Sequence, residues 1–496
     1  MALGVAAPLV VMPAAAQDVT LTSREGRITL SGTMAGFDGE FYRVETRYGT
    51  LTLDAASVIC EGPGCPDLRA PKAVIRVMGA ADAGARLLPA LFSAFSEARG
   101  LDWRPATAAP DGSWQAEIRD PQDGRLLGEV SFAPATAEGA DAALAAGTAE
   151  FALSRIAPAG MAARPVALDA LVPIVAPGNP TPHISTADLA HALSGEIRNW
   201  AALGGPDMPL VLHAIAPDSD IGGALGRRIG VTLQADVVHP DVRALAEAVA
   251  ADPWALALAT MAEAGAAAVL PLTDSCAFPL RPDPLALAAG DYPLSVPLMV
   301  TIPARRLPLL AREFHDFLAM PAAAAVARAQ GYAARDLERA RLARDDSRLL
   351  NAIRALPEDA SLAELRRLAA LMEEAERLSP TFRFDETGAT LDALSQDALA
   401  DLAQRIAAGQ FPDRRLILVG FTDAGDGPSR DAAAEVGRDL ATLLPDLDSG
   451  SLPQTTGFGA LLPLACDDTA TGRHMNRRVE LWSVPDFAPR VPLVAH

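Results

Sequence analysis

Lysine is almost absent from this chain of 496 residues, because Lys72 is the only one. A Walker-type phosphate loop needs a lysine after its glycines, and no lysine follows such a loop here, so this class of nucleotide site is excluded. A Schiff-base lysine would have to be Lys72. That residue stands in the stretch RAPKAVIRV, at the expected start of a strand and not in a desolvated pocket.

Long apolar runs are also missing after the N-terminus, so the sequence predicts no membrane span. The first residues, MALGVAAPLVVMPAAAQDV, are apolar and end in Ala14-Ala15-Ala16 before Gln17. Small residues at this place are typical of a secretory signal that is cleaved there, so residues 1–16 are interpreted as a signal peptide, although the usual positive charge is missing. A loose apolar tail is the alternative.

Only four cysteines occur. Cys60 and Cys65 flank the turn-forming stretch EGPG, and we expect them to close a small disulfide loop in an oxidising compartment. Four reduced, buried thiols are the alternative. Cys276 and Cys466 lie far apart in the sequence, and we expect no pairing between them. Two close cysteines and seven histidines without metal spacing predict no metal site, and no cofactor is expected.

Positive charge is scarce as well: 42 Lys and Arg face 62 Asp and Glu, for a formal net charge of -20. Such an acidic chain is not expected to bind nucleic acid or anionic membrane surfaces. The composition is otherwise globular, with 50% hydrophobic residues, and the length predicts two to four domains.

The patterning predicts a multidomain, mainly α/β protein. Residues 17–70 alternate apolar and polar residues around glycine turns, which indicates a small β-rich domain, either a barrel or a meander. Residues 71–337 alternate strands with helices and predict α/β layers with parallel sheet, in one domain or two lobes. Residues 338–376 have helical periodicity and are interpreted as a stiff helical connector, divided by Pro357. Residues 377–485 read as strand, helix, strand, helix, strand.

The stretch ALDALVPIVAPGNPTPHISTADLAHALSGEIRNWAALGG resembles the hinge and second lobe of periplasmic phosphate-binding (PstS-like) proteins. The shared features are the Asp169 strand, Asn179-Pro180, the helix that ends in Ser194-Gly195-Glu196-Ile197, and Asn199-Trp200. The resemblance extends over about 72–337. It implies two lobes that close on an anion, which is held by hydroxyls, helix N-termini and an arginine.

The residues matching that anion site are Ala80, Ala81, Ser154, Arg155, Ser219 and Asp220. The sequence departs from the family here, because Ser219-Asp220-Ile221 replaces Ser-Gly-Thr and brings a carboxylate towards a dianion site. At about 4 Å, such like charges repel by roughly 1–4 kcal/mol. The domain is therefore expected either to bind phosphate, as a receptor for an ATP-driven importer would, or to be a retained scaffold whose cleft is empty or serves another small anion, another small ligand or a protein.

The last segment resembles the peptidoglycan-binding domain of the OmpA C-terminal family. The matching motifs are Phe384-Asp385, Gly420-Phe421-Thr422-Asp423, Arg438, Gly457-x-Gly459 and Asn476-Arg477-Arg478-Val479-Glu480. In that family the Asp and the Arg, at the spacing of Asp423 and Arg438, hold the diaminopimelate of the stem peptide. This ligand presents an ammonium and a carboxylate on one carbon, and an Asp and an Arg can bind both groups.

Phe421, Thr422 and Asp431 are expected to line this peptidoglycan site, whereas Arg477 is expected to be structural. Asp431, Glu435 and Asp439 carry more negative charge around Arg438 than the family pattern has, and they could compete for it. A solvated, charged helix face is the alternative interpretation of these residues.

The sequence thus predicts an exported, non-enzymatic protein of the periplasm, associated with the cell wall or outer membrane and bound to peptidoglycan. A wall hydrolase finds little support, because no G-x-S-x-G, no H-E-x-x-H and no convincing Cys/His pair is present. No catalytic residue is therefore assigned.

Overall fold

The computed structural model describes most of the chain. The described residues are 19–37, 40–62, 64–65, 72–105, 108–156, 161–217, 219–334, 336–342, 346–356, 361–385, 390–423, 429–448 and 450–486. The expected signal peptide, residues 1–16, lies outside them. Within these ranges no helix combines the length and the apolar character that crossing a membrane requires.

The N-terminal part is a five-stranded antiparallel meander. Its strands are β1 (Val19–Ser23), β2 (Thr29–Phe37), β3 (Phe41–Thr46), β4 (Gly49–Asp54) and β5 (Val58–Glu61), in the order β4-β3-β2-β1-β5. Alternate side chains of β1 and β3 form its small core, so the period-two pattern of the sequence is realised here. Cys60 and Cys65 form a disulfide at the end of β5.

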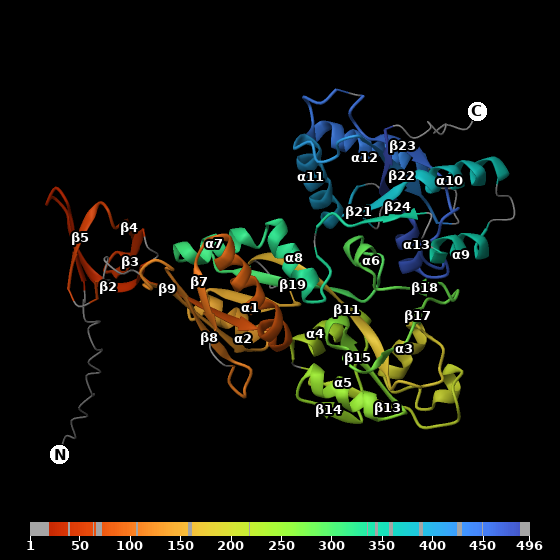
Figure 1. Ribbon diagram of the computed structural model, residues 1–496, viewed down its shortest axis with the longest axis horizontal. Coiled ribbons are helices and arrows are strands. Elements are labelled where there is room, and N and C mark those ends of the chain that lie inside the picture. Colours follow the sequence, from red (N-terminus) through yellow and green to blue (C-terminus); the bar gives the residue numbers. More distant parts are fainter. Residues whose placement is uncertain are drawn as a thin grey trace, which may run out of the picture.

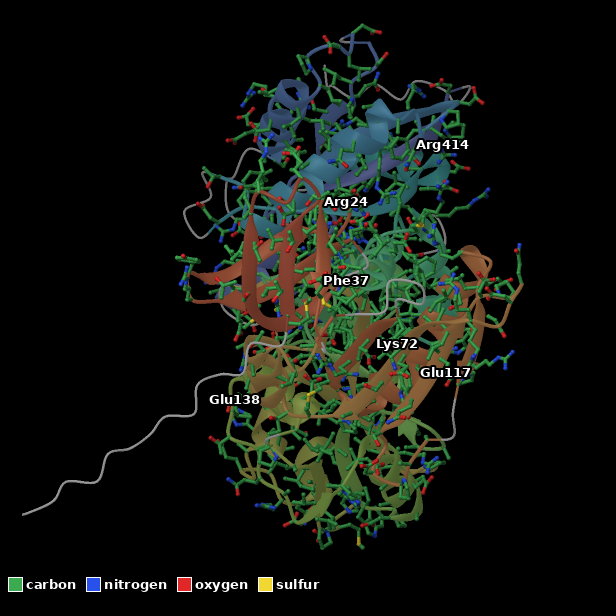
Figure 2. The ribbon with its side chains drawn as sticks, turned by 90° about the vertical axis from the view of Figure 1, so that its left-hand side faces the viewer. Arg24, Phe37, Lys72, Glu117, Glu138 and Arg414 are labelled. Atoms are coloured by element: carbon green, nitrogen blue, oxygen red, sulfur yellow. A yellow bond between two sulfur atoms is a disulfide. The ribbon has the colours of Figure 1, made fainter. Side chains whose placement is uncertain are left out.

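The N-terminal sheet lies at one end of the molecule, against the first lobe of the middle domain (Figure 1). Arg306 and Arg312 both donate to the Glu40 carboxylate, at 2.9 and 3.0 Å. The Arg306 guanidinium also lies 4.0 Å from the centre of the Phe41 ring. Lys72, labelled in Figure 2, precedes the next strand and forms an exposed ion pair with Glu129.

The middle domain alternates strands and helices. Its strands are β6 (Ala73–Gly79), β7 (Asp102–Pro105), β8 (Trp114–Arg119), β9 (Leu126–Pro134), β10 (Phe151–Ser154), β11 (Ala162–Val175), β12 (Ile184–Ser185), β13 (Val211–Ile215), β14 (Val237–His239), β15 (Ala255–Thr260), β16 (Ala268–Val269), β17 (Leu272–Thr273), β18 (Pro279–Leu280) and β19 (Ser295–Ile302). Its helices are α1 (Ala81–Ala98), α2 (Ala137–Ala146), α3 (Thr186–Leu193), α4 (Asp220–Ile229), α5 (Val242–Ala251), α6 (Pro284–Ala288), α7 (Leu309–Phe317) and α8 (Pro321–Ala329), with short 3-10 turns at Trp200–Leu203 and Met261–Glu263.

Separate hydrophobic cores divide this domain into two lobes. Lobe 1 is built on β6–β10 with α1, α2, α7 and α8, and lobe 2 on β13–β15 with α3–α6. The long strands β11 and β19 run through both lobes and join them in one sheet. The sheet is mixed: β6, β9 and β10 are parallel, as are β13, β14 and β15, whereas β7, β8, β11 and β19 pair antiparallel.

The last domain is a second α/β unit. Its elements are β20 (Arg339–Arg341), α9 (Asp346–Arg354), α10 (Leu362–Glu374), β21 (Glu376–Arg383), α11 (Ala393–Ala407), β22 (Arg414–Phe421), α12 (Ser429–Leu443), β23 (Gln454–Gly457), α13 (Ala470–Asn476) and β24 (Arg478–Pro485). The sheet order is β20-β21-β24-β22-β23. Helices α11 and α12 cover one face and α10 covers the other, each with its own core.

The expected helical connector, residues 338–376, is wrong in two respects. Arg339–Arg341 form the edge strand β20, which pairs with β21 although its composition favours helix. The helix α10 packs Leu368, Leu371 and Met372 on the sheet of the last domain instead of spanning solvent. The helical periodicity was real in α9 and α10, but tertiary pairing overrides propensity in the short edge strand.

The expectation that Cys276 and Cys466 stay unpaired is also wrong, because the structure joins them in a disulfide. Cys276 lies in the turn between β17 and β18 of lobe 2, and Cys466 lies in the loop before α13 of the last domain. A separation of 190 residues in sequence says nothing about distance in space once two domains dock. The bond therefore links two domains covalently.

Candidate functional site

The first candidate site lies where the start of α1, the end of β10 and the start of α4 meet. Gly79 ends β6 with a φ of 141°, and a Cβ atom there would lie 1.9 Å from the Leu153 carbonyl oxygen. Only glycine therefore allows β6 to approach β10 this closely before the chain turns into α1. The Ala80 N–H donates to the same carbonyl. This turn carries the N-terminus of α1 to Ser154 and Arg155.

Arg155 is the centre of a buried cluster with three carboxylates. Its guanidinium donates to Asp82 of α1, Asp169 of β11 and Asp220 of α4, at 3.0, 3.2 and 3.1 Å. The Arg155 side chain is fully buried, and the carboxylate side chains are 11%, 1% and 5% exposed. Because α1 and β10 belong to lobe 1 and α4 to lobe 2, the Arg155 cluster joins the lobes.

Asp220 takes up the donors that an anion would need. Its Oδ1 accepts from the Ser154 hydroxyl at 2.6 Å and from the Arg155 backbone N–H at 2.9 Å. Its Oδ2 accepts from the Arg155 guanidinium. These are the hydroxyl, amide and arginine donors that bind anions by charge-assisted hydrogen bonds. The carboxylate of Asp220 therefore occupies the hydroxyl, the amide and one side of the guanidinium as an internal anion.

The structure brings only three of the six expected anion-site residues together, namely Ser154, Arg155 and Asp220. Ala80 is buried and its N–H is used, while Ala81 is the first residue of α1. The Ser219 hydroxyl caps α4 and donates to a carbonyl of the preceding turn. Two members of the cluster, Asp82 and Asp169, were not predicted. The sequence does hint at them, because Asp82 is a carboxylate at a helix start and Asp169 is a carboxylate inside an apolar strand.

Burial and charge act in opposite directions on the carboxylates of the Arg155 cluster. Burial raises the pKa of Asp82, but the charge and hydrogen bonds of Arg155 and two backbone N–H groups outweigh it and hold this pKa below its ordinary value. For Asp169 burial prevails and the charge of Asp82 adds to it, so the pKa of Asp169 rises to about 6. Burial lowers the pKa of Arg155, yet the surrounding carboxylates raise it well above its usual range.

The raised pKa of Asp169 predicts a pH dependence of stability. An unfolded Asp has a pKa of about 3.9, so the stabilisation from protonated Asp169 is complete below about pH 4 and is lost as pH rises through about 6. Asp82 acts only at lower pH, because its pKa is depressed. Relative to Asp169→Asn, the wild type should lose about 2–3 kcal/mol of unfolding free energy from pH 4 to 7, measured calorimetrically. A constant difference between the two proteins would contradict this assignment.

The second candidate site lies at the end of β22, where the first residue of α12 packs closely against two glycines. A Cβ atom at Gly420 would lie 1.7 Å from the Ser429 carbonyl oxygen, and one at Gly457 would lie 2.4 Å from the Ser429 Oγ. The Ser429 hydroxyl accepts from the Gly459 N–H, and the Thr422 N–H donates to the Gly459 carbonyl. These close contacts fix the segment after β22 beside the first turn of α12.

Asp423 has a cation beside it that sequence reasoning assigned to another role. The Nε of Arg477 lies 3.7 Å from the Asp423 Oδ2, and the Arg477 side chain is 45% exposed. The next residue, Arg478, is fully buried, pairs with Glu480 and covers the Phe421 ring. The buried structural contacts are thus made by Arg478, and Arg477 lies at the surface beside Asp423, so the role expected for Arg477 stays a prediction.

Arg438 lies on the exposed side of α12, and its side chain forms no ion pair with any residue in the described ranges. Asp431 is exposed in the first turn of the same helix, and Thr422 is partly buried. Residues 424–428, between Asp423 and α12, lie outside the described residues. Among the described residues, none of the three carboxylates expected to compete for Arg438, those of Asp431, Glu435 and Asp439, forms an ion pair with it.

Phe421 does not line this site, so that expectation is wrong. Its side chain is 2% exposed and packs with Phe458 and Trp482 in the core beneath α10. Side chains alternate along a strand, and α12 covers the opposite face of β22. Among the described residues, no three His, Cys, Asp or Glu side chains are arranged to hold a metal ion.

Residues 129–321 match the family model described as a PBP superfamily domain. Among solved structures, the chain is similar to a putative phosphate ABC transporter substrate-binding protein with bound phosphate from Clostridium perfringens, at 14% identity and a TM-score of 0.43, covering 53% of this chain and 99% of that chain. An ABC-type phosphate transport receptor from Vibrio cholerae matches at 18% identity and a TM-score of 0.41, covering 52% and 98%. No curated protein matches.

The protein is therefore a mixed α/β, multidomain chain with a periplasmic-binding-protein-like domain. The resemblance of residues 377–485 to the OmpA C-terminal family stays a prediction, as do the export of the chain and its wall-bound location.

Proposed function

We propose that this chain is an exported, non-enzymatic protein of the cell envelope that binds peptidoglycan through its last domain. The periplasmic-binding-protein-like domain is carried as a closed module. It does not act as a high-affinity phosphate receptor, because its own Asp220 uses the anion donors. No nucleic acid partner is proposed for a chain of this acidity.

The observation that carries the wall-binding proposal is the charge arrangement at the end of β22. A partly buried carboxylate, Asp423, is held beside the exposed cation Arg477, and a second exposed cation, Arg438, lies on the adjoining helix. The free end of diaminopimelate carries an ammonium and a carboxylate, so Asp423 would bind the ammonium and an arginine the carboxylate. Strand and helix hold these groups, which reduces the ordering cost of binding.

A phosphate receptor is the second candidate, and the family match of residues 129–321 favours a protein with this binding-protein fold without naming its ligand. Such a receptor must release Asp220 from Ser154 and Arg155 before an anion can bind. Moving this carboxylate would leave a buried negative charge without its hydrogen bonds, which is costly. Calorimetric titration with inorganic phosphate distinguishes the candidates: sub-micromolar binding by the wild type would favour the receptor.

Soluble stem peptide containing diaminopimelate is expected to bind the full-length chain, and Asp423→Ala and Arg438→Ala should each weaken this binding at least about tenfold. The reason is the loss of one charge-assisted contact, worth roughly 1.5–3 kcal/mol. Isothermal titration calorimetry measures the change directly.

Asp439→Ala is the matched control, because Asp439 is an exposed neighbour of Arg438 on the same helix. Its affinity should equal that of the wild type or exceed it slightly. Equal affinities for the wild type and for both site variants would show that Asp423 and Arg438 do not form the site.

A further inference from the structure

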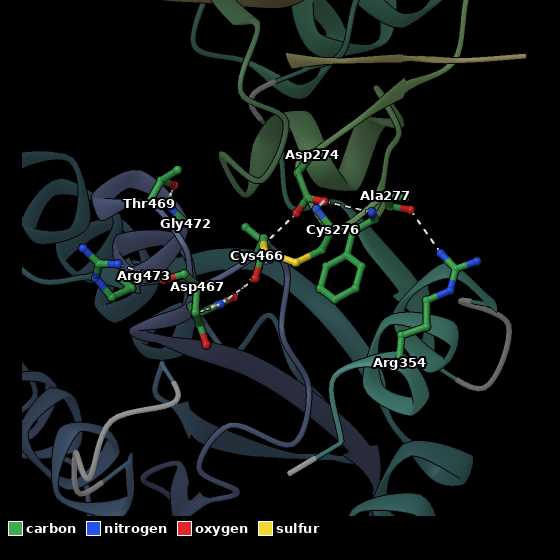
Figure 3. The surroundings of a disulfide bond; sticks show 12 residues. Asp274, Cys276, Ala277, Arg354, Cys466, Asp467, Thr469, Gly472 and Arg473 are labelled. Carbon is green, nitrogen blue, oxygen red and sulfur yellow. Dashed lines mark hydrogen bonds between the residues drawn. A yellow bond between two sulfur atoms is a disulfide. The ribbon is translucent and has the colours of Figure 1, made fainter. Parts of the chain in front are cut away.

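The last domain is fastened to lobe 2 around the Cys276–Cys466 disulfide (Figure 3). The Asp274 carboxylate lies between the two chains: it accepts from the Cys276 N–H on its own turn and from the Cys466 N–H of the last domain, at 3.0 and 2.7 Å. Arg354 of α9 donates to the Ala277 carbonyl on the same turn. One short turn of lobe 2 therefore carries a covalent bond and two hydrogen bonds to the last domain.

A second fastening to lobe 2 lies at the buried Asp291, just after α6. Its carboxylate accepts from Arg377 and Arg383 of β21, at 2.6 and 2.7 Å. Arg383 also donates to the Ala289 carbonyl. Burial raises the pKa of Asp291, but the two arginines outweigh it and hold this pKa below its ordinary value, so the group stays ionised. These contacts fix β21 against lobe 2.

The same domain is also tied to lobe 1. After α8 of lobe 1 the chain first joins the core of lobe 2, where Ala333 exchanges two backbone hydrogen bonds with Leu168 of β11, and a few residues later it forms β20. Arg328 of α8 pairs with Glu338 next to β20, at 3.1 Å. The last domain is thus attached to both lobes, outside their junction.

We propose that the last domain is a strap that holds the two lobes closed, with the Cys276–Cys466 disulfide as its releasable fastening. A hinge motion between lobes moves one relative to the other, and a rigid body fixed to both of them opposes it. Release needs a dithiol reductant: its thiolates give two electrons to the S–S bond, Cys276 and Cys466 become thiols, and the reductant becomes a disulfide. After reduction, only the polar contacts hold lobe 2 to the last domain, and lobe 2 can move away from lobe 1.

The Arg155 amide reports on this opening, because its hydrogen bond to Asp220 crosses from lobe 1 to lobe 2. In the full-length double variant Cys276→Ser/Cys466→Ser, the peptide spanning Ser154 and Arg155 should exchange amide hydrogen at least about tenfold faster than in the wild type. Reduction of the wild type with dithiothreitol should have the same effect, which covers the case that the variant fails to fold.

The matched control is Cys60→Ser/Cys65→Ser, which removes the disulfide of the N-terminal sheet and should leave exchange at Arg155 unchanged. The core strand β13 of lobe 2 should keep its protection in every sample. Unchanged exchange at Arg155 after loss of the Cys276–Cys466 bond would overturn the strap. A parallel loss of protection in β13 would overturn it too, because lobe 2 would then unfold rather than open.

Discussion

Replacing Arg155 by methionine should destabilise the two-lobed domain by about 3–5 kcal/mol at pH 7. Three carboxylates at the junction of the lobes share this one fully buried guanidinium, and methionine would fill its volume but leave their charges uncompensated. The loss should shrink at low pH, where the carboxylates can take up protons. Chemical denaturation, followed by the fluorescence of the tryptophans in this domain, measures the change.

Arg99→Met is the control for this substitution, because Arg99 forms an ion pair with Glu313 but is 53% exposed. Such a surface pair should contribute less than about 1 kcal/mol. If Arg155→Met and Arg99→Met had the same small effect, the buried cluster would not hold the lobes together.

The double variant Asp82→Asn/Asp220→Gly should gain phosphate binding of at least about 100-fold over the wild type. Removing Asp220 frees the Ser154 hydroxyl, the Arg155 amide and one side of the guanidinium. Removing the charge of Asp82 lowers repulsion of an anion. Two charge-assisted hydrogen bonds of about 1.5 kcal/mol each account for a change of this size. Calorimetric titration with inorganic phosphate measures it.

Asp82→Asn alone provides the control, because it removes one charge but leaves Asp220 bound to Ser154 and Arg155. It should bind phosphate no better than the wild type. If the folded double variant titrates like this single variant, then Asp220 does not act as the internal anion.

Local patterns were enough to predict most elements of the fold. The alternation in β1 and β3, the buried strand β22 and the helices α1 and α12 follow from periodicity that each segment carries by itself. Even there, periodicity does not define the end of an element: Leu443 continues the apolar spacing of Val436 and Leu440, but as the last residue of α12 it is 49% exposed. The edge strand β20 was not predicted, because its structure depends on pairing with β21 and not on its own sequence pattern.

The candidate sites were predictable only as far as local motifs reach. Asp423 lies two residues after β22, and Arg438 lies on the helix that follows, α12. Local motifs do not tell which of the two neighbours, Arg477 or Arg478, is buried. That depends on which face of β24 its first residue presents to the core. The Arg155 cluster and the Cys276–Cys466 bond join residues 14 to 190 positions apart, and docking of whole lobes and domains creates them.

The proposed closure of the middle domain, next to a proposed wall-binding domain, would have a mechanical consequence. The middle domain and the last domain form one body through the disulfide and the Asp291 contacts. A protein of this kind would hold a fixed surface at a fixed place on the wall, whereas a transport receptor must open and release its ligand.

Co-sedimentation with insoluble peptidoglycan tests the central claim most directly. The full-length chain should sediment with peptidoglycan that contains diaminopimelate, and free diaminopimelate stem peptide should release it. Peptidoglycan with lysine at that position, which lacks the second carboxylate, should retain little of the chain, because the arginine contact is lost. Equal retention on both kinds of wall, or no release by the free peptide, would contradict the proposed function.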